Sequence, residues 1–371
     1  MTLPTVQPQV ILCLCPENYH WKLIPGYAAA FRRRGFEFFC IQDTLPFDVP
    51  LDEILKLSPG RPSWIFHFES ALPLLPQGLE SSPIPTVCFH ADTYVFTRRR
   101  IRWSYLFDHV AVFHPGYDRL FTRAGHPDAF LLPYAVRREF FDGPELLREF
   151  EVGWVGQNTG HIYRRRAEWL PRFAAEFCTN DLSRHYSLEE VADVYRRSQI
   201  VVNIGRDDYP QDANLRVFEA LASGALLLTS LPSELTDLGF QDGVHFIGYH
   251  DENEMIPLVR KFLVDEPTRT RIAAAARAKT LAEHTYDSRA AQLLAHLEKA
   301  GSKKLAPARY WPEPRARLMA LDFFASHAVL DCAAAQFQLI VGHGFRETFE
   351  GAILVAKAWI KHHRRLRNSR A

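Results

Sequence analysis

Residues 214–230 read Asn-Leu-Arg-Val-Phe-Glu-Ala-Leu-Ala-Ser-Gly-Ala-Leu-Leu-Leu-Thr-Ser, which predicts a short apolar helix that stops at Gly224 and runs directly into a buried strand. Arg216 and Glu219 are three residues apart, so they lie on one face of this helix together with Ser223. A carboxylate on a helix with little polar surface needs a partner, because an unpaired buried charge costs on the order of several kcal/mol. Two interpretations are open. Arg216 is that partner in an ion pair, or Glu219 accepts hydrogen bonds from ligand hydroxyls while the helix start faces an anionic ligand.

The length and composition define the class of protein. A chain of 371 residues is too long for one hydrophobic core, so we expect two domains and an appendage. An apolar content of 47% with 13% aromatic residues excludes a disordered chain. The formal net charge of +1 argues against a nucleic-acid partner, since nucleic-acid-binding domains are usually strongly basic.

The cysteines indicate a reduced protein. No C-x-x-C pair and no His/Cys metal-ligand spacing occurs, and most cysteines lie in apolar runs, where a free cysteine acts as a small hydrophobe. The six are Cys13, Cys15, Cys40, Cys88, Cys178 and Cys332. The N-terminus lacks the pattern of a signal peptide, and no run approaches the roughly 18 apolar residues of a membrane-spanning helix. We therefore expect a soluble, cytoplasmic protein without disulfides or zinc.

Short apolar runs alternate with helical or loop segments over the first 150 residues. The first run, Val10 to Cys15, leads into an amphipathic helix, Trp21 to Arg34, which Gly35 caps. Further strands are expected at residues 36–41, 62–68, 86–90, 108–114 and 129–133. This alternation predicts a parallel, doubly wound α/β sheet.

A second round of alternation begins at Val152. Its helices are expected at residues 163–177, 188–198, 214–223, 254–264 and 268–283. The polar stretch 137–151, which contains proline and glycine, is the expected hinge between the two rounds. The remaining helical segments are expected at 286–299, 313–341 and 347–367.

Several segments of the second round carry a resemblance to a known family. Arg216 to Thr229 matches the pattern R-x-F-E-A-x-A-x-G-x-x-x-x-T. The other segments are Glu151-Val-Gly-Trp-Val-Gly-Gln-Asn158, Val194-Tyr-Arg-Arg-Ser-Gln-Ile-Val-Val-Asn203, Leu238-Gly-Phe-Gln-Asp-Gly-Val-His-Phe246 and Tyr249-His-Asp-Glu-Asn-Glu254. In this order they resemble the GT-B glycosyltransferases, most closely the retaining group that includes the CgeB-like, spore-maturation-type enzymes. The likeness covers about residues 150–295 and, more weakly, the residues before them.

The resemblance implies a GT-B fold, in which two Rossmann-like, doubly wound domains face a cleft. We place an N-terminal acceptor-side domain at residues 1–147, a nucleotide-sugar-binding domain with a return helix at 148–300, and a helical C-terminal extension at 301–371. The implied activity is transfer of a sugar from a nucleotide-diphosphate donor to a hydroxyl of a glycan, lipid or protein acceptor. Family members of this group transfer with retention, and with neither a metal ion nor another cofactor.

The resemblance also implies roles in donor binding. Glu219 matches the glutamate that holds the ribose hydroxyls. The helix start around Ala213, Asn214 and Leu215 would face the diphosphate in place of a metal ion, although Asn214 also fits a cap without a ligand. A basic residue after the glycine turn at 156–160 aligns best with Arg166, while its neighbours Arg164 and Arg165 fit a solvated helix start. The other donor-site candidates are Gly156, Gln157, Asn203, Gln211, Asp212 and Arg216.

One departure from the family pattern concerns the donor sugar. The related E-x7-E pattern has an acid eight residues before Glu219, where this chain has Gln211. Asp212 is one residue out of register, and Asp208 is a further alternative contact. Since charged loop tips after a strand lie at a ligand's edge, the loop 205–212 is expected to form a wall of the site.

His90 and Asp92 are the candidate catalytic residues of the first domain. Both follow a strand at its carboxyl end, where a polar group would position the acceptor or support developing charge. A structural histidine is the alternative for His90. His67 and His20 occupy similar places in the pattern.

Two basic runs lie outside these motifs. Arg98 to Arg102 is interleaved with aromatic residues and would meet an anionic acceptor or a membrane surface, or form a solvated loop. Residues 359–370 would form a basic helix end that contacts anionic lipid or an acidic protein, or simply complements the helix dipole.

Two other functions stay open for the whole chain. A non-catalytic GT-B scaffold or activating partner fits the missing acid at Gln211. A GT-B nucleotide-sugar epimerase shares the fold, but the chain lacks the acid-rich pattern that we expect of one.

Overall fold

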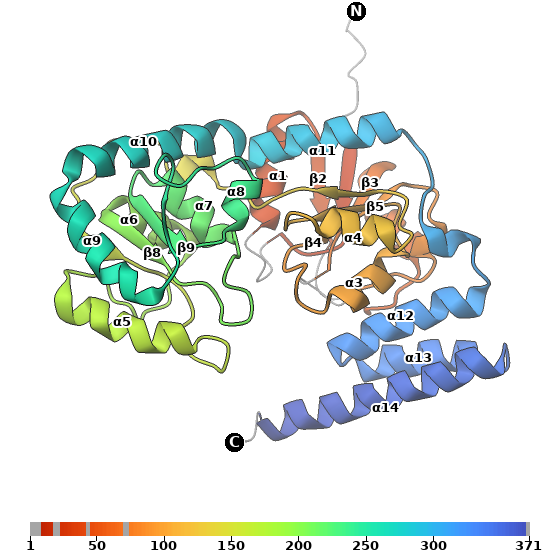
Figure 1. The fold of residues 1–371 in the computed structure, drawn as a ribbon. Coiled ribbons are helices and arrows are strands. Elements are labelled where there is room, and N and C mark those ends of the chain that lie inside the picture. The colour runs from red at the N-terminus through yellow and green to blue at the C-terminus, as the bar shows by residue number, and fades with distance from the viewer. Residues whose placement is uncertain (1–8, 18–22, 42–44, 70–73, 369–371) are drawn as a thin grey trace, which may run out of the picture. The chain divides into compact units, whose positions relative to one another are not determined.

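The computed structural model describes residues 9–17, 23–41, 45–69 and 74–368. Its internal contacts divide the chain into two compact units. The first unit comprises Met1–Leu132 and Leu294–Ala371, and the second unit comprises Pro133–Leu293. The predicted domain boundaries at 147/148 and 300/301 stay a prediction. The C-terminal extension belongs to the first unit (Figure 1).

A six-stranded sheet forms the centre of the first unit, in the order β2-β1-β3-β4-β5-β6. Its strands are β1 (Val10–Cys13), β2 (Glu37–Cys40), β3 (Pro62–Phe68), β4 (Thr86–His90), β5 (His109–Val112) and β6 (Ala129–Leu131). All neighbouring strands pair in parallel. The predicted parallel α/β sheet is confirmed, because the six apolar runs are its six strands.

Helices cover both faces of this sheet. Those between the strands are α1 (Ile24–Arg33), α2 (Leu51–Leu57), the short η1 (Leu79–Ser81), α3 (Thr97–Ser104) and α4 (Tyr117–Arg123). On one face, Tyr27 and Phe31 of α1 pack against Phe66, Phe68 and Phe89. The expected helix from Trp21 is described only from residue 23 on, and His20 also lies outside the described residues.

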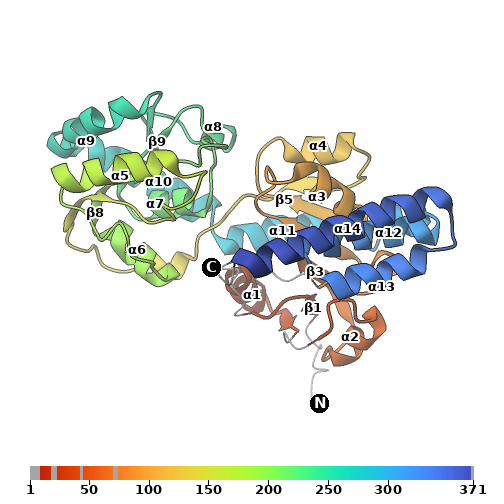
Figure 2. The ribbon, with the colours of Figure 1, turned by 90° about the horizontal axis from the view of Figure 1, so that it is seen from below.

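The C-terminal extension supplies helices to the opposite face. It contains η4 (Pro307–Tyr310), α12 (Glu313–His327), α13 (Leu330–Ile340) and α14 (Phe345–Asn368), and the last three lie side by side in Figures 1 and 2. Phe323 of α12 packs against His67 of β3 and Trp103 of α3, with ring centroids 5.8 and 5.4 Å apart. The described part of the β3–β4 connection holds η1 but no α-helix. Helix α12 therefore takes the place of a crossover helix, and the predicted helical segment 313–341 is broken at Ala328 in the left-handed conformation.

The second unit contains a four-stranded parallel sheet in the order β10-β9-β8-β7. Its strands are β7 (Phe150–Gly153), β8 (Ser198–Asn203), β9 (Leu226–Ser230) and β10 (Ile247–Tyr249). Its helices are η2 (Arg138–Phe140), α5 (Arg164–Glu176), α6 (Leu188–Arg196), α7 (Leu215–Ala222), α8 (Glu234–Asp237), η3 (Glu252–Glu254), α9 (Met255–Val264) and α10 (Glu266–Glu283). Helix α11 (Tyr286–Ala300) begins in the second unit and ends in the first.

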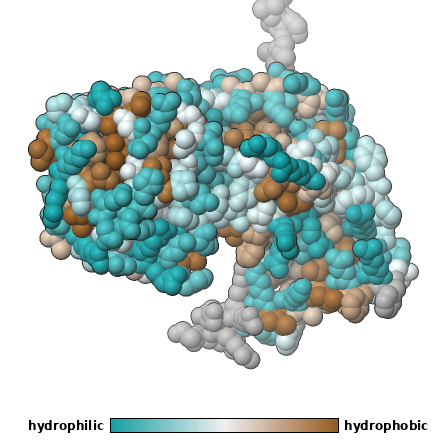
Figure 3. Space-filling view, in the orientation of Figure 1, coloured by the Kyte–Doolittle hydropathy of each residue, from teal (hydrophilic) through white to brown (hydrophobic). Residues whose placement is uncertain are grey.

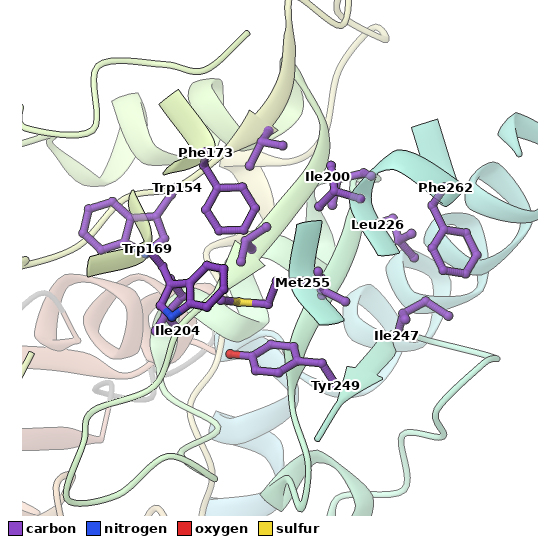
Figure 4. Close-up of a cluster of buried hydrophobic side chains, with 14 of the residues drawn as sticks. Trp154, Trp169, Phe173, Ile200, Ile204, Leu226, Ile247, Tyr249, Met255 and Phe262 are labelled. Atoms are coloured by element: carbon purple, nitrogen blue, oxygen red, sulfur yellow. The ribbon is translucent and has the colours of Figure 1, made fainter. Parts of the chain in front are cut away.

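Alternate positions of the strands build the core of the second unit. Ile200, Val202 and Ile204 point to one face of the sheet, where they join a buried cluster with α5 and α9 (Figure 4). The cluster members from these helices are Trp169, Leu170, Phe173, Met255, Val259 and Phe262. The alternation fixes which side chains of β8 remain for the other face, among them Asn203.

The predicted hinge, residues 137–151, lies within the second unit. Backbone bridges join Val136 to Thr285, and the Arg289 Nε donates to the Pro133 carbonyl at 2.8 Å. A guanidinium nitrogen of Arg277 donates to the Phe141 carbonyl at 2.8 Å. These bonds tie the start of the segment to the junction of α10 and α11.

Candidate functional site

The second sheet has a switch point between β7 and β8. After β7 the chain passes through α5 to Thr179, which bridges Val152 on the far side of β7. It then returns through α6 to β8, which pairs with the near side of β7. In open α/β sheets, ligands bind in the crevice at the carboxyl ends of the strands where such a reversal occurs. The predicted donor-site residues that follow β7 and β8 therefore lie at the expected edge of this sheet.

Arg166 joins the segments that follow β7 and β8. From the first turn of α5, its Nε donates to the Ile204 carbonyl at 2.7 Å and its Nη1 donates to the Gln157 carbonyl at 2.8 Å. The side chain is 9% exposed, and burial lowers the pKa of the guanidinium. A Cβ at Gly156 would lie 2.9 Å from the Trp154 ring, so this turn needs a glycine. Arg166 thus puts a positive charge at the switch point, while its predicted contact with phosphate stays a prediction.

The neighbouring arginines have protein partners. The carboxylate of Asp207 accepts from the backbone amides of Arg164 and Arg165 at 2.9 and 3.4 Å. The Arg165 guanidinium also pairs with Asp207 and Glu252. An acidic side chain at a helix N-terminus is favourable, so Asp207 docks the loop 205–212 onto the start of α5.

Further anchors hold this loop at its other end. Glu234, the first residue of α8, accepts from the Tyr209 hydroxyl at 2.6 Å and from the Ala213 amide at 3.0 Å. The Ser230 hydroxyl donates to the Pro210 carbonyl at 2.8 Å. Sequence reasoning missed Glu234, which is 5% exposed, because its partners lie more than twenty residues away along the chain.

The start of α7 has the expected cap. The Asn214 side chain accepts from the Arg216 amide at 3.0 Å, which identifies Asn214 as the N-cap. The Ala213 amide is bound by Glu234 and is therefore engaged within the protein. In the part of the chain that the structure describes, no hydrogen bond of the Asn214 and Leu215 amides is seen. These two remain the predicted anion-facing amides.

Glu219 lies beside Arg216 in the ion pair that the helical spacing predicts. Glu219 is buried, with 4% exposure, and the Arg216 side chain is about one-quarter exposed. Burial lowers the pKa of Arg216, but Glu219 and the nearby Tyr195 outweigh this effect and raise it. The first interpretation, an ion pair between Arg216 and Glu219, is confirmed. The second interpretation, contact of Glu219 with ligand hydroxyls, stays a prediction.

The remaining donor-site candidates lie around the same strand ends. The side-chain nitrogen of Asn203 donates to the Thr229 hydroxyl at 2.9 Å, and the backbone carbonyl of Asn203 accepts from the Tyr249 hydroxyl. Asp212 is buried and accepts from the side-chain nitrogen Nδ2 of Asn214 at 3.3 Å. The Gln211 carbonyl accepts from the Glu234 amide, and Asp208 pairs with Arg206 at 2.8 Å. The structure thus brings the predicted residues of the second unit to one edge of one sheet.

His90 of the first unit lies in a buried polar network. Its Nδ1 is 3.4 Å from Glu69, which also pairs with Arg100 at 2.8 Å, and its Nε2 is 3.6 Å from the sulfur of Cys88. His327 of α12 lies 3.9 Å from the other oxygen of Glu69. Burial lowers the pKa of His90, whose exposure is 0%. This environment favours the structural alternative for His90, and its catalytic role stays a prediction.

The other first-unit candidates differ in environment. Asp92 is half-buried two residues beyond β4. His67 donates through Nε2 to the Leu74 carbonyl at 2.9 Å, and burial lowers its pKa to about 4. The basic run of α3 is partly internal, because Arg100 pairs with Glu69 and Arg102 pairs with Glu350 at 2.7 Å. The interpretation of this run as a solvated loop is wrong for Arg100, which is buried, whereas Arg102 is half-exposed.

One cluster of the first unit has side chains that metal ions bind. His109, Asp128 and His296 have ligand atoms within 4.8 Å of one another. His296 Nε2 lies 3.0 and 2.9 Å from the two Asp128 oxygens, and His109 Nδ1 contacts the same carboxylate. These contacts already form a hydrogen-bonded His–Asp–His group that anchors α11 at the start of β5. The cluster lies at the amino ends of the strands, away from the edge where α/β proteins bind ligands.

This chain is similar in sequence to one protein family and in fold to several solved structures. Residues 140–295 match the model of a family described as glycosyl transferase-like. HepE of Anabaena, in complex with UDP and glucose, aligns with a TM-score of 0.54 at 12% identity, over 78% of this chain and 100% of its own. Sucrose-phosphate synthase from Thermosynechococcus elongatus aligns with a TM-score of 0.54 at 12% identity, over 79% of this chain and 100% of its own. No curated protein matches the sequence.

A third solved structure has a similar fold to this chain. A UDP-forming α,α-trehalose-phosphate synthase from Burkholderia xenovorans aligns with a TM-score of 0.52 at 10% identity, over 78% of this chain and 99% of its own. At such low identity the likeness shows the fold, and the fold is GT-B. The predicted fold class is confirmed, together with the helical C-terminal region. In the described residues, no helix is long and apolar enough to cross a membrane.

Proposed function

We propose that this chain is a metal-independent, retaining glycosyltransferase that moves a sugar from a nucleotide-diphosphate donor to an acceptor hydroxyl. The proposal rests on the groups that lie together at the edge of the second sheet. There the capped start of α7, the buried Arg166 and the buried Glu219 lie at the switch point of a domain that matches a glycosyl transferase-like family.

The diphosphate is assigned to the start of α7. Departure of the nucleotide breaks the bond between the anomeric carbon and a phosphate oxygen, and negative charge develops on that oxygen. The Asn214 and Leu215 amides and the positive end of the helix are fixed dipoles that stabilise such charge without a metal ion. Arg166, held by two backbone carbonyls, adds a fixed positive charge. Because these groups are already in place, they need little reorganisation during the reaction.

The ribose is assigned to Glu219. A buried carboxylate forms strong hydrogen bonds with two hydroxyls, and Arg216 lies beside it as a counter-charge. The acceptor oxygen would attack the anomeric carbon on the face that the diphosphate leaves, and its proton would pass to the departing phosphate oxygen. Such front-face transfer retains the configuration and needs no protein nucleophile. HepE was solved with UDP-glucose, so a UDP-sugar is the first donor to test.

The test is nucleotide binding by a Glu219→Gln variant. We expect the Kd for the preferred nucleotide among UDP, GDP and TDP to rise about tenfold or more, the effect of losing charged hydrogen bonds to two hydroxyls. Calorimetric titration measures it, with Glu189→Gln on exposed α6 as the matched control. If Glu219 only pairs with Arg216, the variant would lose thermal stability and keep both the wild-type Kd and transfer. That result would refute the assignment.

A donor panel separates the alternatives. Release of nucleotide that depends on an added acceptor supports the transferase. Binding without release from any sugar donor would favour a non-catalytic scaffold, for which the glutamine at position 211 is the supporting feature. A donor recovered with inverted sugar configuration and no acceptor consumed would favour the epimerase.

A further inference from the structure

Exposed apolar side chains are concentrated in the C-terminal helices. Thirteen large apolar side chains of the described residues are exposed, and six of them lie between residues 339 and 360. These are Leu339 (44%), Val341 (52%), Phe349 (60%), Ile353 (40%), Trp359 (57%) and Ile360 (47%). Scattered exposed apolar residues are ordinary, whereas a concentration of them indicates a contact surface.

Four of these residues belong to α14 and follow a helical period. Phe349, Ile353 and Ile360 are spaced by four and seven residues, so they form one stripe along the helix, and the exposed Ala356 continues it. Trp359 flanks these residues and belongs to the same exposed surface. Brown side chains along the lower edge of the helical extension show part of this surface in Figure 3. We refer to Phe349, Ile353, Ala356, Trp359 and Ile360 as the α14 stripe.

The opposite side of α14 is fixed by packing. Leu354 and Ala358 are buried, with 8% and 0% exposure. A Cβ at Gly351 would lie 2.9 Å from the Phe337 ring of α13, so the two helices approach closely there. The stripe cannot turn inward without breaking this packing, and it therefore faces outward in the folded protein.

Beyond Glu350, which pairs with Arg102 at 2.7 Å, the charge along the stripe has one sign. From Gly351 to the C-terminus the sequence contains six lysines and arginines and no aspartate or glutamate. Lys357 is exposed within the span of the stripe. A helix with an aromatic and aliphatic face next to an excess of basic residues is the pattern of segments that lie in the interface of an anionic membrane.

We infer that the α14 stripe docks this protein onto an anionic lipid bilayer, with α14 lying in the plane of the membrane surface. The apolar side chains enter the boundary between headgroups and acyl chains, where tryptophan is favoured. The basic residues attract the negatively charged headgroups. This inference goes beyond the proposed function and does not depend on it.

Vesicle sedimentation with the full-length protein tests this inference. We expect binding to vesicles that contain phosphatidylglycerol, weak binding to pure phosphatidylcholine, and a decrease at high ionic strength because salt screens the attraction. An Ile353→Ser/Ile360→Ser variant should lower the partition coefficient about tenfold. Lys357→Gln should lower it about fivefold.

The matched controls are substitutions of exposed residues elsewhere in the chain. Leu147→Ser/Val264→Ser removes two apolar side chains of the second unit, 79% and 87% exposed, and Lys303→Gln removes one exposed lysine. Both should bind vesicles like the wild type. All variants are checked for a wild-type melting temperature, so that lost binding is not lost folding.

Three outcomes would overturn the inference. Failure of the wild type to bind anionic vesicles is the first, and binding that the stripe variant leaves unchanged is the second. The third is a lipid-free dimer of the wild type that becomes a monomer in the stripe variant, since the stripe would then be a subunit interface.

Discussion

Gly205 lies two residues after the end of β8, at the point where the loop that lines the candidate site folds back. A Cβ added there would lie 2.4 Å from the Pro210 carbonyl oxygen and 2.8 Å from its Cα. Both are backbone atoms, and Pro210 is held by the Ser230 hydroxyl, so the clash cannot be relieved by turning a side chain. The absence of a side chain at position 205 thus decides the shape of the loop.

We therefore predict that Gly205→Ala lowers the free energy of unfolding by about 1–3 kcal/mol, as overpacking typically does. It should also weaken nucleotide binding, because the displaced loop contains Gln211 and Asp212. Denaturant unfolding and calorimetry measure the two effects. Gly60→Ala is the control, since its Cβ would meet only a methyl group of Val10 at 3.5 Å. Equal stability of the two variants would contradict the prediction.

The charged residues of α7 show how far single residues can be interpreted. Spacing alone predicts that Arg216 and Glu219 share a face, and the structure pairs them. Glu234 has the same chemical character, but its partners Tyr209 and Ala213 are brought to it by the fold. No residue within a helical turn of Glu234 indicates these partners.

Among the helices, α12 differs most from its expected place. It was expected in an extension separate from the first domain, yet it covers β3 next to α3. Phe323 is 1% exposed and contacts the rings of His67 and Trp103. A helix from the end of the chain thus completes a core that begins near residue 10.

Phe323→Ala should therefore destabilise the first unit by about 3–5 kcal/mol, the usual cost of removing a buried phenylalanine. The matched control is Phe349→Ala, since Phe349 is 60% exposed on α14. That variant should change the free energy of unfolding by less than about 1 kcal/mol. Chemical denaturation without lipid gives both values. Similar losses in the two variants would show that α12 contributes little to the core.

At the scale of the whole molecule, buried neutral histidines make the fold sensitive to mild acid. Burial lowers the pKa of His67 and His126 to about 4 and that of His284 to about 3. In the unfolded chain these groups have a pKa of about 6.5. Between these values the unfolded state binds more protons than the folded state, so the free energy of unfolding falls as the pH decreases.

We predict a loss of about 2 kcal/mol for each such histidine between pH 7.5 and pH 5. His126 is the site to vary, since its Nε2 contacts the Ser104 and Phe107 carbonyls at 3.1 Å. His126→Gln should reduce the difference in unfolding free energy between the two pH values, and His161→Gln, an exposed site, should not. Denaturant titrations at both pH values provide the comparison. A variant with the full wild-type pH dependence would rule out His126 as a contributor.

Much of the architecture could be predicted because it depends on local patterns. The apolar runs of both sheets, the cap at Asn214 and the Arg216–Glu219 pair are set by residues within a few positions of one another. The GT-B fold followed from the order of several such segments. Donor-site candidates could be placed at one sheet edge, because parallel strands bring their carboxyl ends together.

Local sequence patterns were enough to predict the two rounds of alternating strands and helices and the face on which Glu219 lies. Three features emerge only in the folded chain: α12 covers the first sheet, His90 is buried against Glu69, and Glu234 holds the loop before α7. The difference comes from the range of the interactions. Helical spacing and strand alternation act over a few residues, whereas these contacts join parts of the chain that meet only when the sheets have formed.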